Sequence, residues 1–112
     1  MTDDVMRLQL PTDQWILEEL MGGRNLGANI AKEVGRHKKT ITKRLNQMEE
    51  DSLVNNIGNG VYEVTPKGVA TLRLIDQYER GDEFESLVEK QAEPIEIKGL
   101  EIVDHSDDPS ET

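Results

Sequence analysis

The chain of 112 residues has no cysteine, few aromatic residues and no long apolar run. Without cysteine there is no disulfide, no thiolate metal ligand and no cysteine nucleophile. A membrane-spanning helix needs about 18 or more apolar residues in succession, so none is expected here. The first residues, 1–4, include two acids and precede no apolar segment, which argues against a signal peptide.

Histidine is scarce as well. His37 and His105 are the two histidines, and they lie too far apart to show metal-ligand spacing or to suggest a histidine-based triad. Carboxylates are abundant, but no pair is placed in a convincing cleft. We therefore expect no catalytic residues, no metal, no cofactor and no small-molecule ligand. These absences favour a cytoplasmic binding protein over an enzyme.

The charge distribution is uneven along the chain. The formal net charge of −10 opposes binding to phosphate, but residues 24–48 contain seven bases and one acid. Residues 76–112 contain three bases and thirteen acids. Local charge decides whether a surface attracts a polyanion, because salt screens interactions beyond about 10 Å. The acidic remainder has two interpretations, adaptation to a cytoplasm of very high salt or an ordinary acidic tail.

Three segments before residue 52 show apolar residues at helical spacing. We expect a first helix that begins after Thr12 as its N-cap and a second that runs from Asn25 as its N-cap to about Val34. We expect a third helix over roughly 38–51. Glycines at 22–23 and at 35 end the first two segments. The apolar positions are Trp15, Ile16, Leu20 and Met21 in the first helix, Leu26, Ile30, Ala31 and Val34 in the second, and Ile41, Leu45 and Met48 in the third.

A hairpin and further helices follow. Residues 53–57 and 61–64 flank Gly58-Asn59-Gly60, and Asn-Gly is typical of a tight hairpin turn. Thr65 and Pro66 predict the N-cap and first residue of a helix that runs to about residue 79. Residues 83–91 are a candidate short helix. We expect residues 1–10 to be a flexible arm and residues 104–112 to be a disordered acidic tail.

The order of helix, helix, helix, hairpin and helix predicts an α+β fold that is mainly α. It matches a winged helix-turn-helix with an additional C-terminal helix and an acidic tail. Ala31 is small where the third helix crosses the second, Gly35 permits a sharp turn, and Ile41 anchors the third helix. We expect the winged-helix domain to span residues 11–80. Residues 81–103 form an extension that contacts a dimer mate or another partner.

The third helix is the candidate DNA-reading element, since the major groove admits one α-helix. The candidates for contact with base edges are Lys38, Lys39, Thr40, Thr42, Lys43 and Asn46. Arg24, Arg36 and Arg44 are expected to hold backbone phosphates, which fixes register without reading sequence. Asn25 and Asn29 lie where the second helix begins, and free N–H groups there favour phosphate. The hairpin has no Arg or Lys at its tip, so we do not expect it to enter the minor groove.

The motifs GRNLGANIAKEVG, TKRL and LVNNIGNGVYEVTPKG, within residues 23–68, resemble haloarchaeal winged-helix regulators similar to the repressor of halophage phi-H. The resemblance implies a cytoplasmic, usually dimeric transcriptional regulator from a salt-adapted archaeon or its virus. The chain departs from the family pattern at two positions. Gly27 stands where relatives often have proline, and His37 stands where they usually have serine.

The sequence predicts a homodimeric regulator that binds double-stranded DNA and acts as a repressor by occluding a promoter. The alternative is a winged-helix interaction module whose basic face binds an acidic protein partner. Trp15 is interpreted as a core residue, or otherwise as a dimer anchor, and Tyr62 as packing the hairpin onto the core. The acidic C-terminal segment is disordered, covers the basic helix as a mimic of DNA, or docks a partner.

Overall fold

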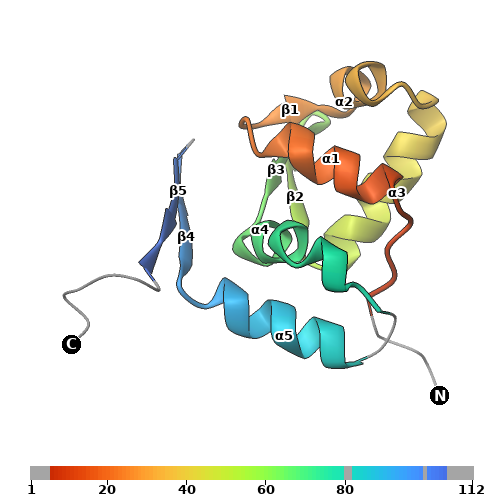
Figure 1. Cartoon of the computed structure of the whole chain (residues 1–112). Helices are drawn as coiled ribbons and strands as arrows, with labels where there is room; N and C mark the ends of the chain where they lie inside the picture. The colour runs from red at the N-terminus through yellow and green to blue at the C-terminus, as the bar shows by residue number, and fades with distance from the viewer. Residues whose placement is uncertain (1–5, 80–81, 100, 106–112) are drawn as a thin grey trace.

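A computed structural model describes residues 6–79, 82–99 and 101–105. These residues form helices and two small antiparallel sheets, an α+β arrangement that is mainly helical (Figure 1). In chain order the elements are α1 (Thr12–Leu20), β1 (Asn25–Leu26), α2 (Gly27–Val34), α3 (Lys38–Glu50), β2 (Val54–Gly58), β3 (Val61–Val64), α4 (Pro66–Arg73), the 3-10 helix η1 (Ile75–Gln77), α5 (Asp82–Ala92), β4 (Ile95–Lys98) and β5 (Glu101–Asp104). Within these ranges, no helix has both the length and the apolar character needed to cross a membrane.

The predicted hairpin is present as β2 and β3. Its turn has positive φ at both central residues, 55° at Asn59 and 74° at Gly60, which is the two-residue turn that suits the twist of paired strands. β3 is the central strand of the first sheet, with β2 on one side and β1 on the other. The short strand β1 pairs Asn25 with Tyr62. The prediction that Asn25 caps the second helix is therefore wrong, because α2 begins at Gly27 with Leu26 as its N-cap.

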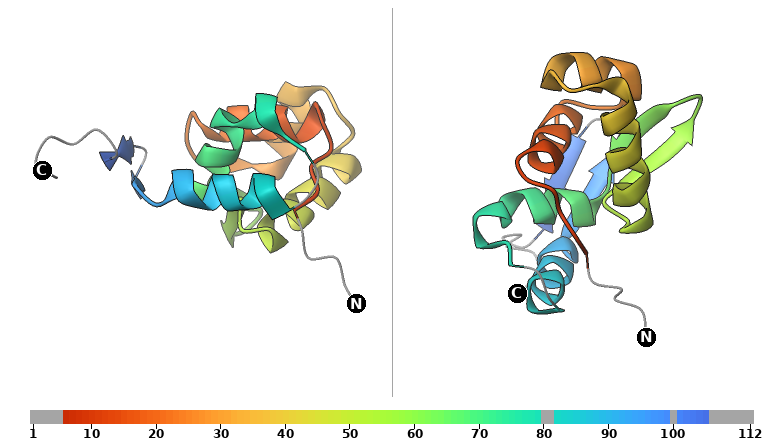
Figure 2. Two further views of the ribbon diagram at one scale, coloured as in Figure 1. Left: turned by 60° about the horizontal axis from the view of Figure 1, so that its bottom comes forward. Right: turned by 90° about the vertical axis from the view of Figure 1, so that its right-hand side faces the viewer.

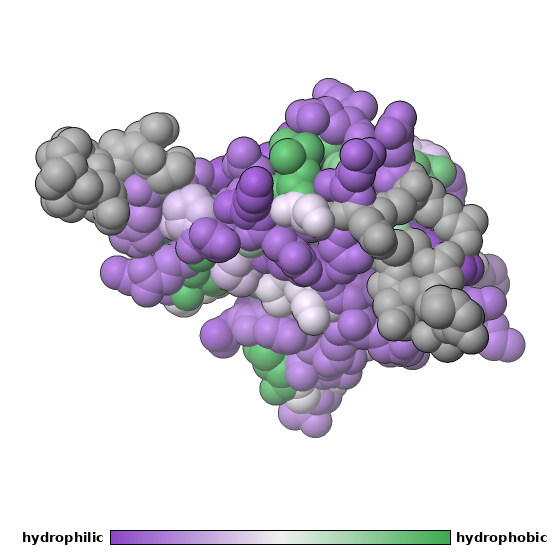
Figure 3. Space-filling model, turned by 90° about the horizontal axis from the view of Figure 1, so that it is seen from below, coloured by the Kyte–Doolittle hydropathy of each residue, from purple (hydrophilic) through white to green (hydrophobic). Residues whose placement is uncertain are grey.

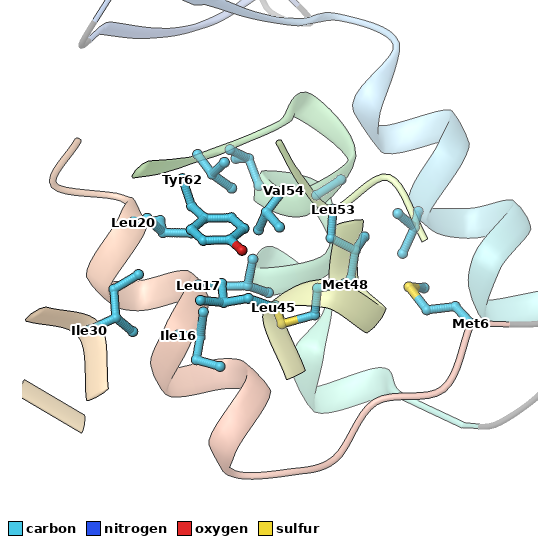
Figure 4. Packing of buried hydrophobic residues seen from close by; sticks show 14 of the residues in the cluster. Met6, Ile16, Leu17, Leu20, Ile30, Leu45, Met48, Leu53, Val54 and Tyr62 are labelled. Carbon is cyan, nitrogen blue, oxygen red and sulfur yellow. The ribbon is translucent and has the colours of Figure 1, made fainter. Parts of the chain in front are cut away.

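The core lies between the helices and the first sheet (Figure 4). Ile41, Leu45 and Met48 on α3 are fully buried, which confirms the predicted inner side of that helix. Tyr62 is buried and packs with Leu20 and Val54 close to its ring, as predicted (Figure 4).

Helix α1 buries Ile16 and Leu20, as the sequence predicts, but its buried stripe also includes Asp13 and Leu17 in place of Trp15. Its buried residues are Asp13, Ile16, Leu17 and Leu20, at positions i, i+3, i+4 and i+7. Trp15 lies off this stripe and outside the buried cluster, so its assignment to the core is wrong. Thr12 is likewise the first residue of α1 rather than its cap, and Pro11 occupies the cap position.

Helix α4 begins as the sequence predicts. The side-chain oxygen of Thr65 accepts a hydrogen bond from the backbone N–H of Gly68 at 3.0 Å, and Pro66 is the first helical residue. The helix ends at Arg73 rather than near residue 79, and the chain continues through η1. This change of direction brings the ring of Tyr78 to 5.1 Å from that of Phe84, edge to face.

The C-terminal extension adds a helix and an unpredicted hairpin. Phe84 and Val88 bury α5 against α4. The β4–β5 hairpin rests its apolar side on the body through Ile95 and Ile97, at the end of the molecule opposite α3 (Figure 1). Seen from the side that includes α5, the surface is mostly hydrophilic with separated apolar patches (Figure 3). Leu87 on α5 is one exposed apolar residue, at 38%.

Both ends of the described chain are held more firmly than predicted. Met6 is buried and its N–H donates to Glu85 at 3.2 Å, so the prediction of a flexible arm is wrong for residues 6–10. At the other end, Asp104 pairs with Arg73, and the N–H of His105 donates to the carbonyl of Pro94 at 2.8 Å. The predicted disorder is therefore wrong for residues 104–105. Residues 1–5 and 106–112 lie outside the described ranges.

Candidate nucleic-acid interface

Helix α3 separates its residues into an inner and an outer side. The six residues predicted to reach base edges are all exposed, and we call them the outer face of α3: Lys38, Lys39, Thr40, Thr42, Lys43 and Asn46. Lys39, Lys43 and Asn46 form a row spaced by three and four residues, opposite the buried Ile41 and Leu45. The hairpin of β2 and β3 projects on the same side of the molecule as α3, away from α5 (Figure 2, right).

The lysines of the outer face have no partner within the described part of the chain. Lys38, Lys39 and Lys43 form neither an ion pair nor a side-chain hydrogen bond there. Five of the nine other basic side chains that the structure describes are paired with acids, in Arg24–Glu63, Arg44–Asp13, Lys67–Glu85, Arg73–Asp104 and Lys98–Glu96. An incoming phosphate can therefore pair with the outer face without first breaking an internal ion pair.

The charges of α3 also run against the helix dipole. Lys38 and Lys39 occupy the first turn, where the positive end of the dipole disfavours cations, and Glu49 and Glu50 occupy the last turn. The N-cap residue, His37, makes no capping hydrogen bond through its side chain. Each misplaced charge costs about 0.3–1 kcal/mol at low ionic strength. A bound anion at the start of α3 would relieve this repulsion.

Arg44 does not belong to the outer face. It is 8% exposed, and its guanidinium donates to both oxygens of Asp13, at 2.9 Å from Nε and 2.8 Å from Nη2. A further bond joins Nη2 to the carbonyl of Arg7 at 3.2 Å. The hydrogen bond with Asp13 raises the pKa of Arg44 further above its usual range. The expected phosphate contact is therefore wrong: Arg44 ties α3 to the start of α1.

Arg24, Asn25 and Asn29 gather where β1 meets α2, and their polar groups are largely engaged within the chain. Arg24 pairs with Glu63 on β3 at 3.2 Å. The side-chain oxygen of Asn25 accepts from the amide of Asn29 at 3.3 Å and from its neighbour's N–H at 2.9 Å. The N–H of Gly27 is also used, since it donates to the carbonyl of Gly60. This corner is thus less open to phosphate than the sequence predicts.

The side-chain amide of Asn56 is engaged within the hairpin. Asn56 uses its side-chain oxygen to accept from Gly58 at 2.9 Å and its side-chain nitrogen to donate to Tyr62 at 3.4 Å. Asn59 remains exposed at the turn, and Ile57 is 43% exposed beside it. Residues 54–61 carry no charge. The hairpin therefore offers no cation to a phosphate backbone.

Arg36 lies in the turn between α2 and α3, directly before the outer face, and is exposed. Its guanidinium carbon is 4.9 Å from the ring centroid of Trp15 on α1.

Among the described residues, no cluster of three histidine, aspartate or glutamate side chains is arranged to hold a metal ion. Comparison with protein-family models, curated proteins and solved structures gives no match to this chain.

Proposed function

We propose that the chain is a sequence-specific regulator that binds double-stranded DNA by placing α3 in the major groove. The observation that carries the proposal is the set of three unpaired lysines on the outer face, whereas five of the nine other described basic side chains pair with acids. A net charge of −10 would otherwise keep a polyanion away.

The arrangement of elements supports a winged helix-turn-helix interpretation. Gly35 ends α2 in the left-handed conformation, at φ 77°, and α3 begins three residues later at Lys38. The β2–β3 hairpin follows and projects on the same side as α3 (Figure 2, right). An α-helix with its side chains is about 10–12 Å across, which fits a major groove about 12 Å wide.

The residues of the outer face suit distinct contacts. In this proposal Lys39 and Lys43 donate to guanine O6 or N7, and Asn46 pairs with adenine through both ends of its amide. Lys38, Thr40 and Thr42 flank this row, where they contact phosphates or, through the threonine methyl groups, thymine. Contacts with base edges specify the sequence, while those with phosphates fix the register of the helix.

We further propose that the protein acts as a homodimer and represses transcription by occluding a promoter. The motifs in residues 23–68 that resemble the phi-H-type regulators support both points. A single helix of 13 residues spans about 20 Å, which covers one short site. Two copies that read half-sites about 34 Å apart would give the length that specific recognition needs.

The test compares two variants that remove the same charge. Duplexes are first selected from a random pool by the wild-type protein, and binding is measured by fluorescence anisotropy across a salt series. Lys39→Ala/Lys43→Ala removes two cations from the outer face and should weaken binding by about tenfold or more. Because the proposal assigns both lysines to base edges, the variant should also discriminate less between the selected duplex and a scrambled one.

The matched control is Lys90→Ala/Lys98→Ala, which removes two exposed lysines from α5 and β4 at the other end of the molecule. It should bind like the wild type. Equal losses in both double variants would show that only net charge matters, and the major-groove proposal would fail. If no duplex is selected while an acidic protein binds the outer face, the interaction-module alternative replaces it.

A further inference from the structure

Trp15 lies off the buried stripe of α1, and the guanidinium of Arg36 lies over its indole ring. The guanidinium carbon is 4.9 Å from the ring centroid, within the range of a cation–π interaction. The indole is partly exposed and lies outside the buried cluster, so the core does not account for its position. The stack instead joins α1 to the turn that precedes α3.

Stacking leaves the hydrogen-bonding capacity of Arg36 unused. A guanidinium presents its flat face to an aromatic ring, while its N–H donors point outward in the plane and match a phosphate in paired fashion. Arg36 makes no ion pair with a described residue, although Glu18, Glu19 and Glu33 line the hollow beside the indole. These carboxylates repel phosphate from the hollow itself and leave the outer edge of Arg36 as the point of approach.

The backbone of the turn is also held in place. The N–H groups of Gly35 and Arg36 both donate to the carbonyl of Ala31, at 2.9 and 3.2 Å. The carbonyl of His37 then accepts from Ile41 at 3.0 Å, which starts α3. The backbone of Arg36 is thus held by hydrogen bonds of the turn, and its side chain is held by the contact with Trp15.

We propose that Trp15 is a positioning residue, which holds Arg36 in place to bind a DNA phosphate at the N-terminal end of α3. The inference rests on the proposed function and deepens it. Holding the side chain before binding reduces the rotamer entropy lost when the phosphate contact forms. Lys38, which has no such support, provides charge without a fixed direction.

A double-mutant cycle tests the coupling between the two side chains, with affinity for a selected duplex as the measurement. Arg36→Ala should weaken binding and lower the salt slope by about 0.9, the value for one phosphate contact. Trp15→Leu should weaken binding about two- to fivefold, with the salt slope unchanged because the charge of Arg36 remains. In the Arg36→Ala background, Trp15→Leu should have no further effect.

Two controls separate positioning from a general disturbance of α1. Trp15→Phe keeps an aromatic face and should restore most of the affinity. Gln14→Leu alters the neighbouring side chain and should bind like the wild type. Trp15 is the single tryptophan of the chain, so its fluorescence should change when duplex is added to the wild type and change much less in Arg36→Ala.

Equal losses from Trp15→Leu in both backgrounds would overturn the inference, since the effect would then not act through Arg36. Wild-type affinity in Arg36→Ala and Trp15→Leu would overturn it too, and would leave the proposed function standing. If the wild-type protein binds no duplex, both proposals fail together.

Discussion

The buried ion pair between Asp13 and Arg44 gives the sharpest prediction about stability. Asp13 is fully buried, and its carboxylate accepts from Arg44 twice and from the N–H of Gln9 at 2.9 Å. Asp13→Ala leaves the buried guanidinium with the carbonyl of Arg7 as its remaining partner. Removing one member of a buried pair costs about 3–5 kcal/mol, because the other charge stays buried without compensation.

That loss is a large part of the stability of a small domain, which is about 5–15 kcal/mol in total. At roughly 4 °C or more per kcal/mol for a chain of this length, we expect the Tm of Asp13→Ala to fall by about 12 °C or more. Urea unfolding followed by circular dichroism gives the free energy directly. The loss should be similar at low and high salt, because ions screen a buried pair much less than an exposed one.

The control replaces both partners. Asp13→Leu/Arg44→Met removes the two charges and keeps apolar volume, so it should recover most of the stability that Asp13→Ala loses. A loss below about 1 kcal/mol in Asp13→Ala, as for an exposed pair, would refute the reasoning. So would a double variant that is less stable than the single one.

Variants at three positions test local features of the fold. Gly68→Ala should lower the free energy of unfolding by about 2 kcal/mol or more in urea melts, since its Cβ would lie 2.2 Å from the carbonyl oxygen of Leu53; an unchanged midpoint would contradict this prediction. Thr65→Ala removes the cap of α4 and should lower the free energy of unfolding by about 1 kcal/mol in the same melts. Thr65→Ser keeps the hydroxyl and should keep most of the wild-type stability. Burial raises the pKa of Asp51 above 3.8, so the folded state holds its proton more tightly than the unfolded chain does. The stability that protonated Asp51 contributes is therefore lost as pH rises through its folded pKa. Asp51→Asn should have a higher free energy of unfolding than the wild type at pH 7, and no such advantage well below pH 3.8.

The fold was most predictable where local chemistry and packing agree. The inner side of α3, the Asn59-Gly60 turn and the Thr65-Pro66 start of α4 each follow from signals within a few residues. By contrast, β1 is two residues long and shows no periodicity, and its pairing with β3 depends on the tertiary fold. The β4–β5 hairpin did leave a signal, because Ile95 and Ile97 alternate before Gly99, which has a φ of 62°.

The candidate site was predictable in its exposed part but not in its buried one. The lysines of α3 are visible as a basic cluster in an acidic chain, and their exposure follows from the apolar stripe. Arg44 was misassigned because its charge suggested phosphate, although it lies three residues after Ile41 on the inner side of the helix. Asp13 lies on the buried stripe of α1. An acid and a base, each on the apolar stripe of its own helix, could have predicted the buried ion pair.

Amide chemical-shift mapping tests most directly whether the N-terminal half of α3 contacts DNA. ¹⁵N-labelled protein would be titrated with a selected duplex and with the same duplex in scrambled sequence. We expect the largest shifts in residues 36–46, with small changes in α5 and in the β4–β5 hairpin. Shifts concentrated in α5 or β4–β5, or the absence of any change at saturating duplex, would contradict that contact.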